Sequence, residues 1–223
     1  MEAERAFRKA KLTTPRAAAL AGILFSVLLI TSLVIIRISV PADPQDAGEW
    51  LSGSWKIVNI ALNIVPFAGI AFLWFIGVVR DRLGQDEDRF FATVFLGSGL
   101  LFLGMLFMST AIAGSTINLY GSSQNIPLSS GIYTFGRTTT YEIMNVYTMK
   151  MAGVFMISTC TLSLRTGIIP RWIAFLGLAL ALFLLFSIGF FTWASLVFPL
   201  WVLLISVHIL IANLGRSNNE SVA

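Results

Sequence analysis

An uncharged stretch near the C-terminus restricts the fold more than any other feature of the sequence. The 44 residues between Arg171 and Arg216 contain no Asp, Glu, Lys or Arg. As one helix they would extend about 66 Å, which is roughly twice the thickness of the hydrocarbon core of a bilayer. The segment must therefore turn back on itself, and residues 187–192 are the expected corner. Two membrane-spanning helices are predicted, at about 172–188 and 193–214.

The same length criterion finds four further spans upstream. A helix needs about 20 predominantly apolar residues to cross the hydrocarbon core. Stretches of that length lie at about 17–38, 57–79, 90–115 and 140–164. Composition agrees, because 57% of the residues are hydrophobic and 12% are charged, against about 25% charged in soluble domains. The sequence therefore predicts an all-α integral membrane bundle of six transmembrane helices.

Basic residues set the predicted orientation of these spans. If the N-terminus lies in the cytoplasm, eleven of the fifteen Lys and Arg residues fall on the cytoplasmic side. The outer side then has the other four, which are Arg37, Lys56, Arg137 and Lys150. The positive-inside rule therefore predicts that both termini are cytoplasmic. Residues 1–16 form a basic cytoplasmic N-terminal segment, residues 17–214 form the transmembrane domain, and residues 215–223 form a short cytoplasmic tail.

The net charge of +4 does not indicate a nucleic-acid partner. Five basic residues cluster within residues 1–16, directly before an apolar span. Basic residues in that position orient a membrane protein and attract anionic lipid headgroups. The expected partner is therefore the lipid bilayer, and nucleic acid is excluded.

The two predicted cytoplasmic turns resemble known sequences. Phe75–Gly84 (FIGVVRDRLG) and Leu164–Gly177 (LRTGIIPRWIAFLG) are similar to stretches of uncharacterised bacterial multi-pass membrane proteins in domain-of-unknown-function groupings. The resemblance implies a multi-pass protein of the bacterial inner (plasma) membrane. It implies no activity, substrate or catalytic residue, because these motifs are turns and membrane anchors.

Motifs of common enzymes are absent, which favours a non-enzymatic protein. The chain has no G-x-S-x-G, Walker A, G-x-G-x-x-G or H-E-x-x-H motif. Its one cysteine, Cys160, cannot form an intramolecular disulfide or a cysteine-based metal site. Its one histidine, His208, cannot supply both axial ligands of a haem. We therefore expect no metal and no cofactor.

Lys150 is the most unusual ionisable residue, because it lies about ten residues inside the fourth predicted span. A charge at that depth is costly and needs a partner, water or a route to the interface. Tyr147 lies one turn away on the same helix face. Glu142 ends a Thr-Thr-Tyr-Glu capping box, which is predicted to start this span after a loop at 118–138.

Other polar residues lie at the same predicted depth. Asn59 and Asn63 are one turn apart in the second span, and Arg37 ends the first. This clustering predicts either an outward-facing basic cavity or a set of hydrogen bonds between helices, and both alternatives stay open. The candidate ligand-binding residues are Lys150, Glu142, Tyr147, Asn63, Asn59 and Arg37.

The first functional hypothesis is a non-enzymatic accessory or assembly subunit that works through helix packing. The motifs Ala18-x-x-x-Gly22 and Gly177-x-x-x-Ala181 fit it, because small residues allow helices to approach closely. The partners would be other membrane subunits or further copies of the chain.

The alternative is a small transporter or binding protein for a small anion or a lipid headgroup, using a basic pocket around Lys150. An intramembrane enzyme is a third hypothesis. It would need an acid–base pair, for which Glu142 and Tyr147 are the only candidates. Substrate, oligomeric state and partner identity are not encoded in any of these patterns.

Overall fold

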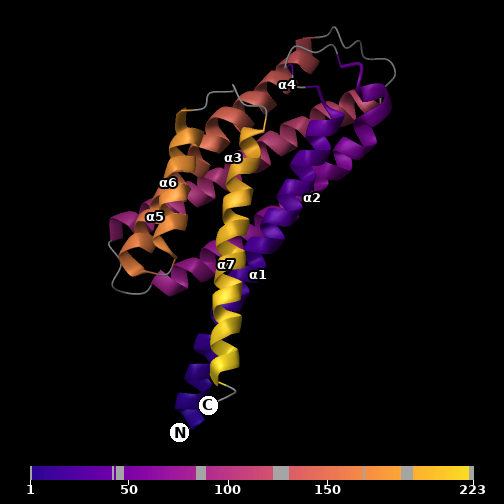
Figure 1. Cartoon of the computed structure of the whole chain (residues 1–223). Coiled ribbons are helices and arrows are strands. Elements are labelled where there is room, and N and C mark those ends of the chain that lie inside the picture. The colour runs from indigo at the N-terminus through magenta and orange to yellow at the C-terminus, as the bar shows by residue number, and fades with distance from the viewer. Residues whose placement is uncertain are drawn as a thin grey trace.

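The computed structural model describes residues 2–41, 43, 48–83, 89–122, 131–167, 169–186 and 193–220. These residues form helices joined by turns and contain no strand, so the all-α prediction is confirmed. In chain order (Figure 1) the helices are α1 (Glu2–Ser39), α2 (Leu51–Leu83), α3 (Arg89–Ser122), α4 (Gly131–Glu142), the π-helix η1 (Ile143–Thr148), α5 (Met149–Thr166), α6 (Arg171–Phe186), the 3₁₀-helix η2 (Ala194–Leu196) and α7 (Val197–Glu220).

Four helical stretches are long and apolar enough to cross a membrane, which indicates a membrane protein. They are Ala17–Ser39, Leu51–Arg80, Ala92–Tyr120 and Ala194–Ala212. A fifth apolar helix, α6, has 16 residues and a length of about 24 Å. α4, η1 and α5 follow one another without a break from Gly131 to Thr166.

The chain reverses direction along the bundle from α1 to α2 and from α2 to α3, whereas α4, η1 and α5 continue in one direction (Figure 1). α1 packs against both α2 and α7, and α3 packs against both α2 and α5. α5 also packs against α6, which contacts α7 more weakly. The first turns of α1 and the last turns of α7 lie side by side at one end of the bundle. We call the opposite end, where α1 ends and α2 begins, the outer end.

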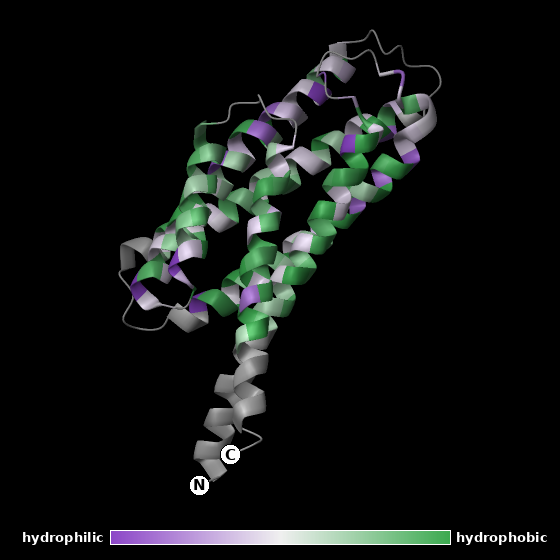
Figure 2. Cartoon of the chain, in the orientation of Figure 1, coloured by the Kyte–Doolittle hydropathy of each residue, from purple (hydrophilic) through white to green (hydrophobic). Residues whose placement is uncertain are grey.

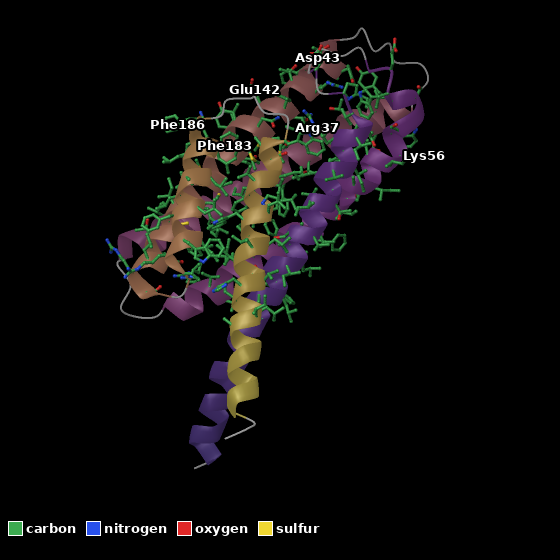
Figure 3. The ribbon with its side chains drawn as sticks, in the orientation of Figure 1. Arg37, Asp43, Lys56, Glu142, Phe183 and Phe186 are labelled. Carbon is green, nitrogen blue, oxygen red and sulfur yellow. The ribbon has the colours of Figure 1, made fainter. Side chains whose placement is uncertain are left out.

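Polar and apolar residues separate along this bundle. Figure 2 shows apolar residues through its middle and polar residues concentrated towards the ends. Several ionisable side chains lie towards the outer end, as Figure 3 shows for Arg37, Asp43, Lys56 and Glu142. An apolar middle with polar ends is the pattern that a bilayer requires of a protein that crosses it.

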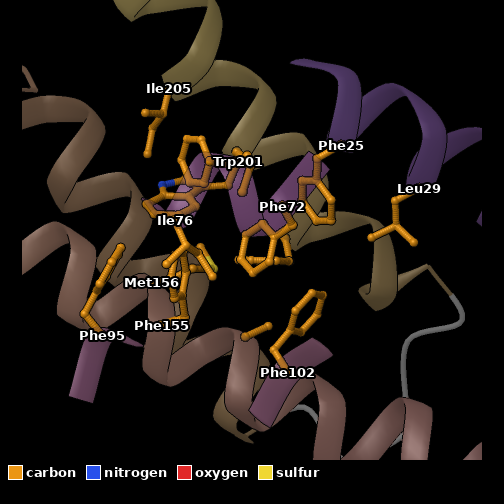
Figure 4. Close-up of a cluster of buried hydrophobic side chains, with 14 of the residues drawn as sticks. Phe25, Leu29, Phe72, Ile76, Phe95, Phe102, Phe155, Met156, Trp201 and Ile205 are labelled. Carbon is orange, nitrogen blue, oxygen red and sulfur yellow. The ribbon is translucent and has the colours of Figure 1, made fainter. Parts of the chain in front are cut away.

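An aromatic core ties five helices together (Figure 4). Phe72 of α2 lies at its centre and is fully buried. The centroid of its ring is 4.6 Å from that of Phe25 in α1, 5.3 Å from Phe102 in α3, 5.2 Å from Phe155 in α5 and 5.6 Å from Phe198 in α7. Rings at these separations gain quadrupole attraction as well as apolar contact. α5 is thus part of the same core as the four apolar helices.

Small residues allow the closest helix contacts, as the small-residue motifs predict. A Cβ atom added to Gly22 of α1 would collide with the hydroxyl of Ser206 in α7. A Cβ atom added to Gly177 of α6 would collide with the Trp201 ring and the Cys160 sulfur. The prediction that these glycines permit close approach is therefore confirmed.

The helices at the outer end are longer than hydropathy predicts. α2 begins at Leu51 rather than near residue 57, and α3 continues to Ser122 rather than ending near residue 115. A second apolar cluster explains the extensions, because it buries side chains from these outer turns. Its buried members are Leu51, Val58, Leu62, Ile117, Tyr120 and Tyr133.

The predicted capping box and part of the predicted loop are wrong. Residues 131–138 are helical, and Glu142 lies inside a continuous helix rather than at the start of one. The Gly/Ser/Asn-rich composition of residues 118–138 favours a loop, but burial of Tyr133 and Gly136 against α3 stabilises the helical form of residues 131–138. The predicted corner at 187–192 lies outside the described residues.

Candidate functional site

The π-helix η1 leaves backbone carbonyls that side chains satisfy. The Thr148 hydroxyl donates to Ile143 O at 2.8 Å, and the Asn145 amide donates to Tyr141 O at 3.0 Å. The Ser109 hydroxyl of α3 donates to Thr140 O at 3.1 Å. A π-helical turn widens the helix and displaces its hydrogen bonds, and such turns often occur at functional sites. Here the turn lies between two cavities.

The first cavity, which we call the apolar cavity, has a volume of about 160 Å³. It is bordered at the outer end by α1, α2, α3 and the α4–η1 segment. Most of its lining is aliphatic, including Leu33, Ile36, Val58, Leu62 and Leu106.

The second cavity, which we call the arginine cavity, has a volume of about 170 Å³. It lies between the end of α1, the α4–η1 segment and the η2 turn that precedes α7. Its polar lining includes Arg37, Tyr141, Asn145 and Ser195, and Trp193 and Leu196 add apolar surface.

The two cavities share a wall. Six residues line both of them, namely Leu33, Ile36, Val40, Arg137, Thr140 and Met144. The Thr140 Oγ1 atom in this wall is buried and has no hydrogen-bond partner among the described residues. An unsatisfied buried hydroxyl carries a free-energy cost, which a bound polar group or water would remove.

Arg37 contributes a positive charge to the arginine cavity. Its side chain is half-buried in the last turn of α1. It makes no hydrogen bond or ion pair within the described part of the chain. No Asp or Glu is among the described residues that line either cavity. Because a guanidinium has five N–H donors in a planar fork, Arg37 is suited to a carboxylate or a phosphate.

Arg137, in contrast, donates hydrogen bonds to neighbouring groups of the protein. Its guanidinium donates to Tyr133 Oη at 3.0 Å, to Pro41 O at 3.0 Å and to Asp43 O. The Trp50 indole N–H donates to the same Tyr133 oxygen at 3.1 Å. These bonds hold Pro41 and Asp43 against α4. Arg137 therefore contributes positive charge to both cavities, while its donors are engaged with the protein.

Gly48 allows the backbone that precedes α2 to lie close to Tyr133 of α4. Its φ of 88° is in the left-handed region that favours glycine, and the ring of Tyr133 lies where a Cβ atom would be. The edge of the Tyr120 ring packs on Tyr133 with the ring centroids 5.5 Å apart. Trp50, Tyr133 and Arg137 thus line the apolar cavity as one hydrogen-bonded group.

The residues predicted from sequence are divided between different places. Arg37 lines the arginine cavity. Asn59 and Asn63 line a separate groove of about 420 Å³ between α2 and α3, and the Asn63 amide donates to Asn59 O at 2.8 Å. Glu142, Tyr147 and Lys150 line neither cavity and do not line this groove.

Lys150, Glu142 and Tyr147 themselves differ in exposure. Glu142 and Tyr147 are exposed, and Lys150 is half-buried at the start of α5. Within the described residues Lys150 takes part in no hydrogen bond or ion pair. The structure therefore does not bring Lys150 to Arg37, and the cations that line the two cavities are Arg37 and Arg137 instead.

Sequence reasoning did not select Arg137, Thr140, Tyr141 or Asn145 as site residues. Their spacing contains a signal, because Tyr133, Arg137, Tyr141 and Asn145 recur every four residues, as on one face of a helix. The interpretation of residues 118–138 as a loop concealed that periodicity.

Comparisons with protein-family models, curated proteins and solved structures find no match to this chain. In the described ranges no group of three or more His, Cys, Asp or Glu residues is placed to hold a metal ion. The function is therefore argued from the cavities and their side chains.

Proposed function

We propose that the chain crosses the bacterial inner membrane six times, with both termini in the cytoplasm. The α4–η1–α5 rod and α6 would be the fourth and fifth spans. Support comes from Phe155, which places α5 in the core shared by four apolar helices, and from Gly177, which seats α6 against Trp201. Arg165 and Arg171 then face the cytoplasm, in agreement with the positive-inside rule.

Labelling of single introduced cysteines distinguishes six spans from four. Cys160 is buried and is expected not to react, so Ser52→Cys and Thr166→Cys each add one exposed thiol. In intact cells, a membrane-impermeant maleimide is expected to label Ser52→Cys but not Thr166→Cys. If only the four long apolar helices crossed, Thr166 would lie on the outer side. Labelling of both variants would therefore contradict the six-span topology.

We further propose that the protein binds an anionic group at its outer end and is not an enzyme. The observation that carries this proposal is Arg37, a half-buried guanidinium that lines a cavity without an acidic neighbour in its described lining. Tyr141, Asn145 and Ser195 add groups that can orient a carboxylate or a phosphate. A transporter would use the same site to receive its substrate from the outer side.

Replacing Arg37 tests this function. Arg37→Gln is expected to weaken octanoate binding by about 10- to 100-fold, because a hydrogen bond to a charged group contributes about 1.5–3 kcal/mol. Octanol, which has no charge, is expected to bind weakly to both proteins. Titration calorimetry of the purified protein in a neutral detergent measures both affinities.

Two matched variants serve as controls for the loss of one positive charge. Lys56 is exposed near Trp55, Lys150 is half-buried in α5, and neither lines the arginine cavity. Lys56→Gln and Lys150→Gln are expected to change octanoate affinity by less than about threefold, because neither side chain lines the cavity and charges without direct contact are screened by salt. A larger loss in Lys150→Gln than in Arg37→Gln would return the site to Lys150 and refute the arginine cavity.

An accessory or assembly role is the second proposal, and the groove between α2 and α3 favours it. Asn63 is exposed there, and Pro66 lacks the N–H that would bond the Leu62 carbonyl. Polar groups that face lipid are costly unless another helix satisfies them. Co-purification of a second membrane protein that is lost in Asn63→Leu would support this role.

A further inference from the structure

We infer that the ligand of the arginine cavity is a single-chain anionic amphiphile whose acyl chain occupies the apolar cavity. This inference rests on the proposed anion-binding function. It adds the class of ligand, namely a carboxylate or phosphate headgroup on one unbranched alkyl chain. The shared wall, the hydrogen bonds of the cavity lining and the cavity volume all favour such a ligand.

The shared wall places the polar arginine cavity directly beside the apolar cavity. Met144 lines both cavities, and its unbranched thioether side chain can change rotamer at low cost. Leu33, Ile36 and Val40 make the α1 side of the same wall. A headgroup at Arg37 therefore has the apolar cavity directly beside it. A free inorganic anion would leave that second space unused.

Four of the polar residues that line the apolar cavity donate their hydrogen bonds to protein groups. The Thr110 hydroxyl donates to Leu106 O at 2.7 Å, and the Thr116 hydroxyl donates to Ile112 O at 2.8 Å. The Ser109 hydroxyl donates to Thr140 O, and the Trp50 indole donates to Tyr133. These groups are turned towards the protein, so the cavity presents mainly apolar surface. Such a space favours methylene groups over a second headgroup.

The Thr140 hydroxyl is the exception, and it lies in the wall between the cavities. Its oxygen is buried without a partner among the described residues. A carboxylate or phosphate bound at Arg37 has acceptor oxygens for this hydroxyl to donate to. The headgroup end of the ligand would thus satisfy one guanidinium and one orphan hydroxyl, while its chain enters the apolar side.

The volume limits the length of the chain. The apolar cavity, at about 160 Å³, is close in size to an engineered cavity of about 150 Å³ that holds benzene. It therefore has room for about six carbon atoms beyond those near the headgroup. We expect medium-chain ligands, of roughly eight to ten carbons, to bind best.

The experiment measures affinity against chain length in a variant that fills the apolar cavity. Ala113 of α3 lines this cavity, so Ala113→Leu adds three carbons to it. Ala111 lies two residues away and is exposed in the groove between α2 and α3, so Ala111→Leu is the matched control. Butanoate, hexanoate, octanoate and decanoate are titrated into the full-length protein and both variants in the same neutral detergent.

In the unmodified protein and in Ala111→Leu, affinity is expected to rise about threefold to fourfold per methylene up to about ten carbons. In Ala113→Leu the rise is expected to stop near six carbons, with butanoate affinity unchanged within twofold. If the affinity of Ala113→Leu rose with ligand chain length as far as that of the unmodified protein, the inference would be overturned. If Arg37→Gln fails to weaken butanoate, the proposed function itself fails, and the two failures are distinguishable.

Fluorescence gives a second measurement that does not depend on the volume change. Trp50 lines the apolar cavity, and Trp193 lines the arginine cavity. Decanoate brominated at its last carbon is expected to quench fluorescence in Trp193→Phe but much less in Trp50→Phe. Equal quenching in both variants would contradict entry of the chain into the apolar cavity.

The affinities of octyl phosphate and inorganic phosphate separate a lipid-like source of the anion from a free one. Tighter binding of octyl phosphate supports the amphiphile. Equal binding of the two compounds overturns the inference.

Discussion

Phe72→Ala is expected to lower the free energy of unfolding by about 3–5 kcal/mol, the range observed for large aromatic truncations in a packed core. Phe72 is fully buried, and its ring meets aromatic rings from α1, α3, α5 and α7. Its removal leaves a cavity that five helices border, and the surrounding rings can relax into it only in part. Equilibrium unfolding by increasing mole fraction of SDS in mixed micelles measures the change.

Phe67→Ala is the matched control on the same helix. The Phe67 side chain is 64% exposed, so its truncation removes no core contact. We expect a change below about 1 kcal/mol, as for substitutions away from packed sites. Similar losses in the two variants would mean that Phe72 is not the centre of the core, and that the bundle is held together elsewhere.

Hydropathy predicts the helices of this chain well, because the physics behind it is local. Apolar residues in sufficient number must be helical if they lie in lipid, since backbone groups find no other partners there. Helices α1, α2, α3, α6 and α7 follow from this argument alone. The number of membrane crossings does not follow from it, because the segment from α4 to α5 includes polar residues and α6 is short.

Helix ends at the outer side could not be predicted, because contacts distant in sequence decide them. Residues 131–138 have the composition of a loop, yet they form the start of α4. Tyr133 is buried there against Tyr120 and accepts hydrogen bonds from Trp50 and Arg137. No pattern within residues 118–138 shows that Trp50 will be close.

The candidate site shows the same limit. Arg37 could be predicted, because a basic residue at the outer end of an apolar span is conspicuous. Lys150 was equally conspicuous, but hydropathy does not say which neighbours a side chain will face. The structure places Lys150 outside both cavities and brings Arg37 beside Tyr141 and Asn145 instead. Position along a helix could therefore be predicted, whereas position around the helix could not.

Gly177→Leu is the second large effect that we expect, with a loss of about 1–3 kcal/mol or more from overpacking. Any side chain at Gly177 would collide with the Trp201 ring and the Cys160 sulfur. Trp201 belongs to the aromatic core and is 2% exposed, so it has little room to move. The added side chain must therefore push α6 away from α5 and α7.

Cys160 reports on this movement directly. The thiol is buried, and it is the only one in the chain, so it should be unreactive towards maleimide in the unmodified protein. In Gly177→Leu we expect the Cys160 thiol to react, together with the loss of stability in SDS. Gly104→Leu is the control, because no described atom lies within 4 Å of a Cβ atom at Gly104 and leucine is the better helix former. A protected thiol and unchanged stability in Gly177→Leu would show that α6 does not depend on this contact, and would remove one support for α6 as a membrane span.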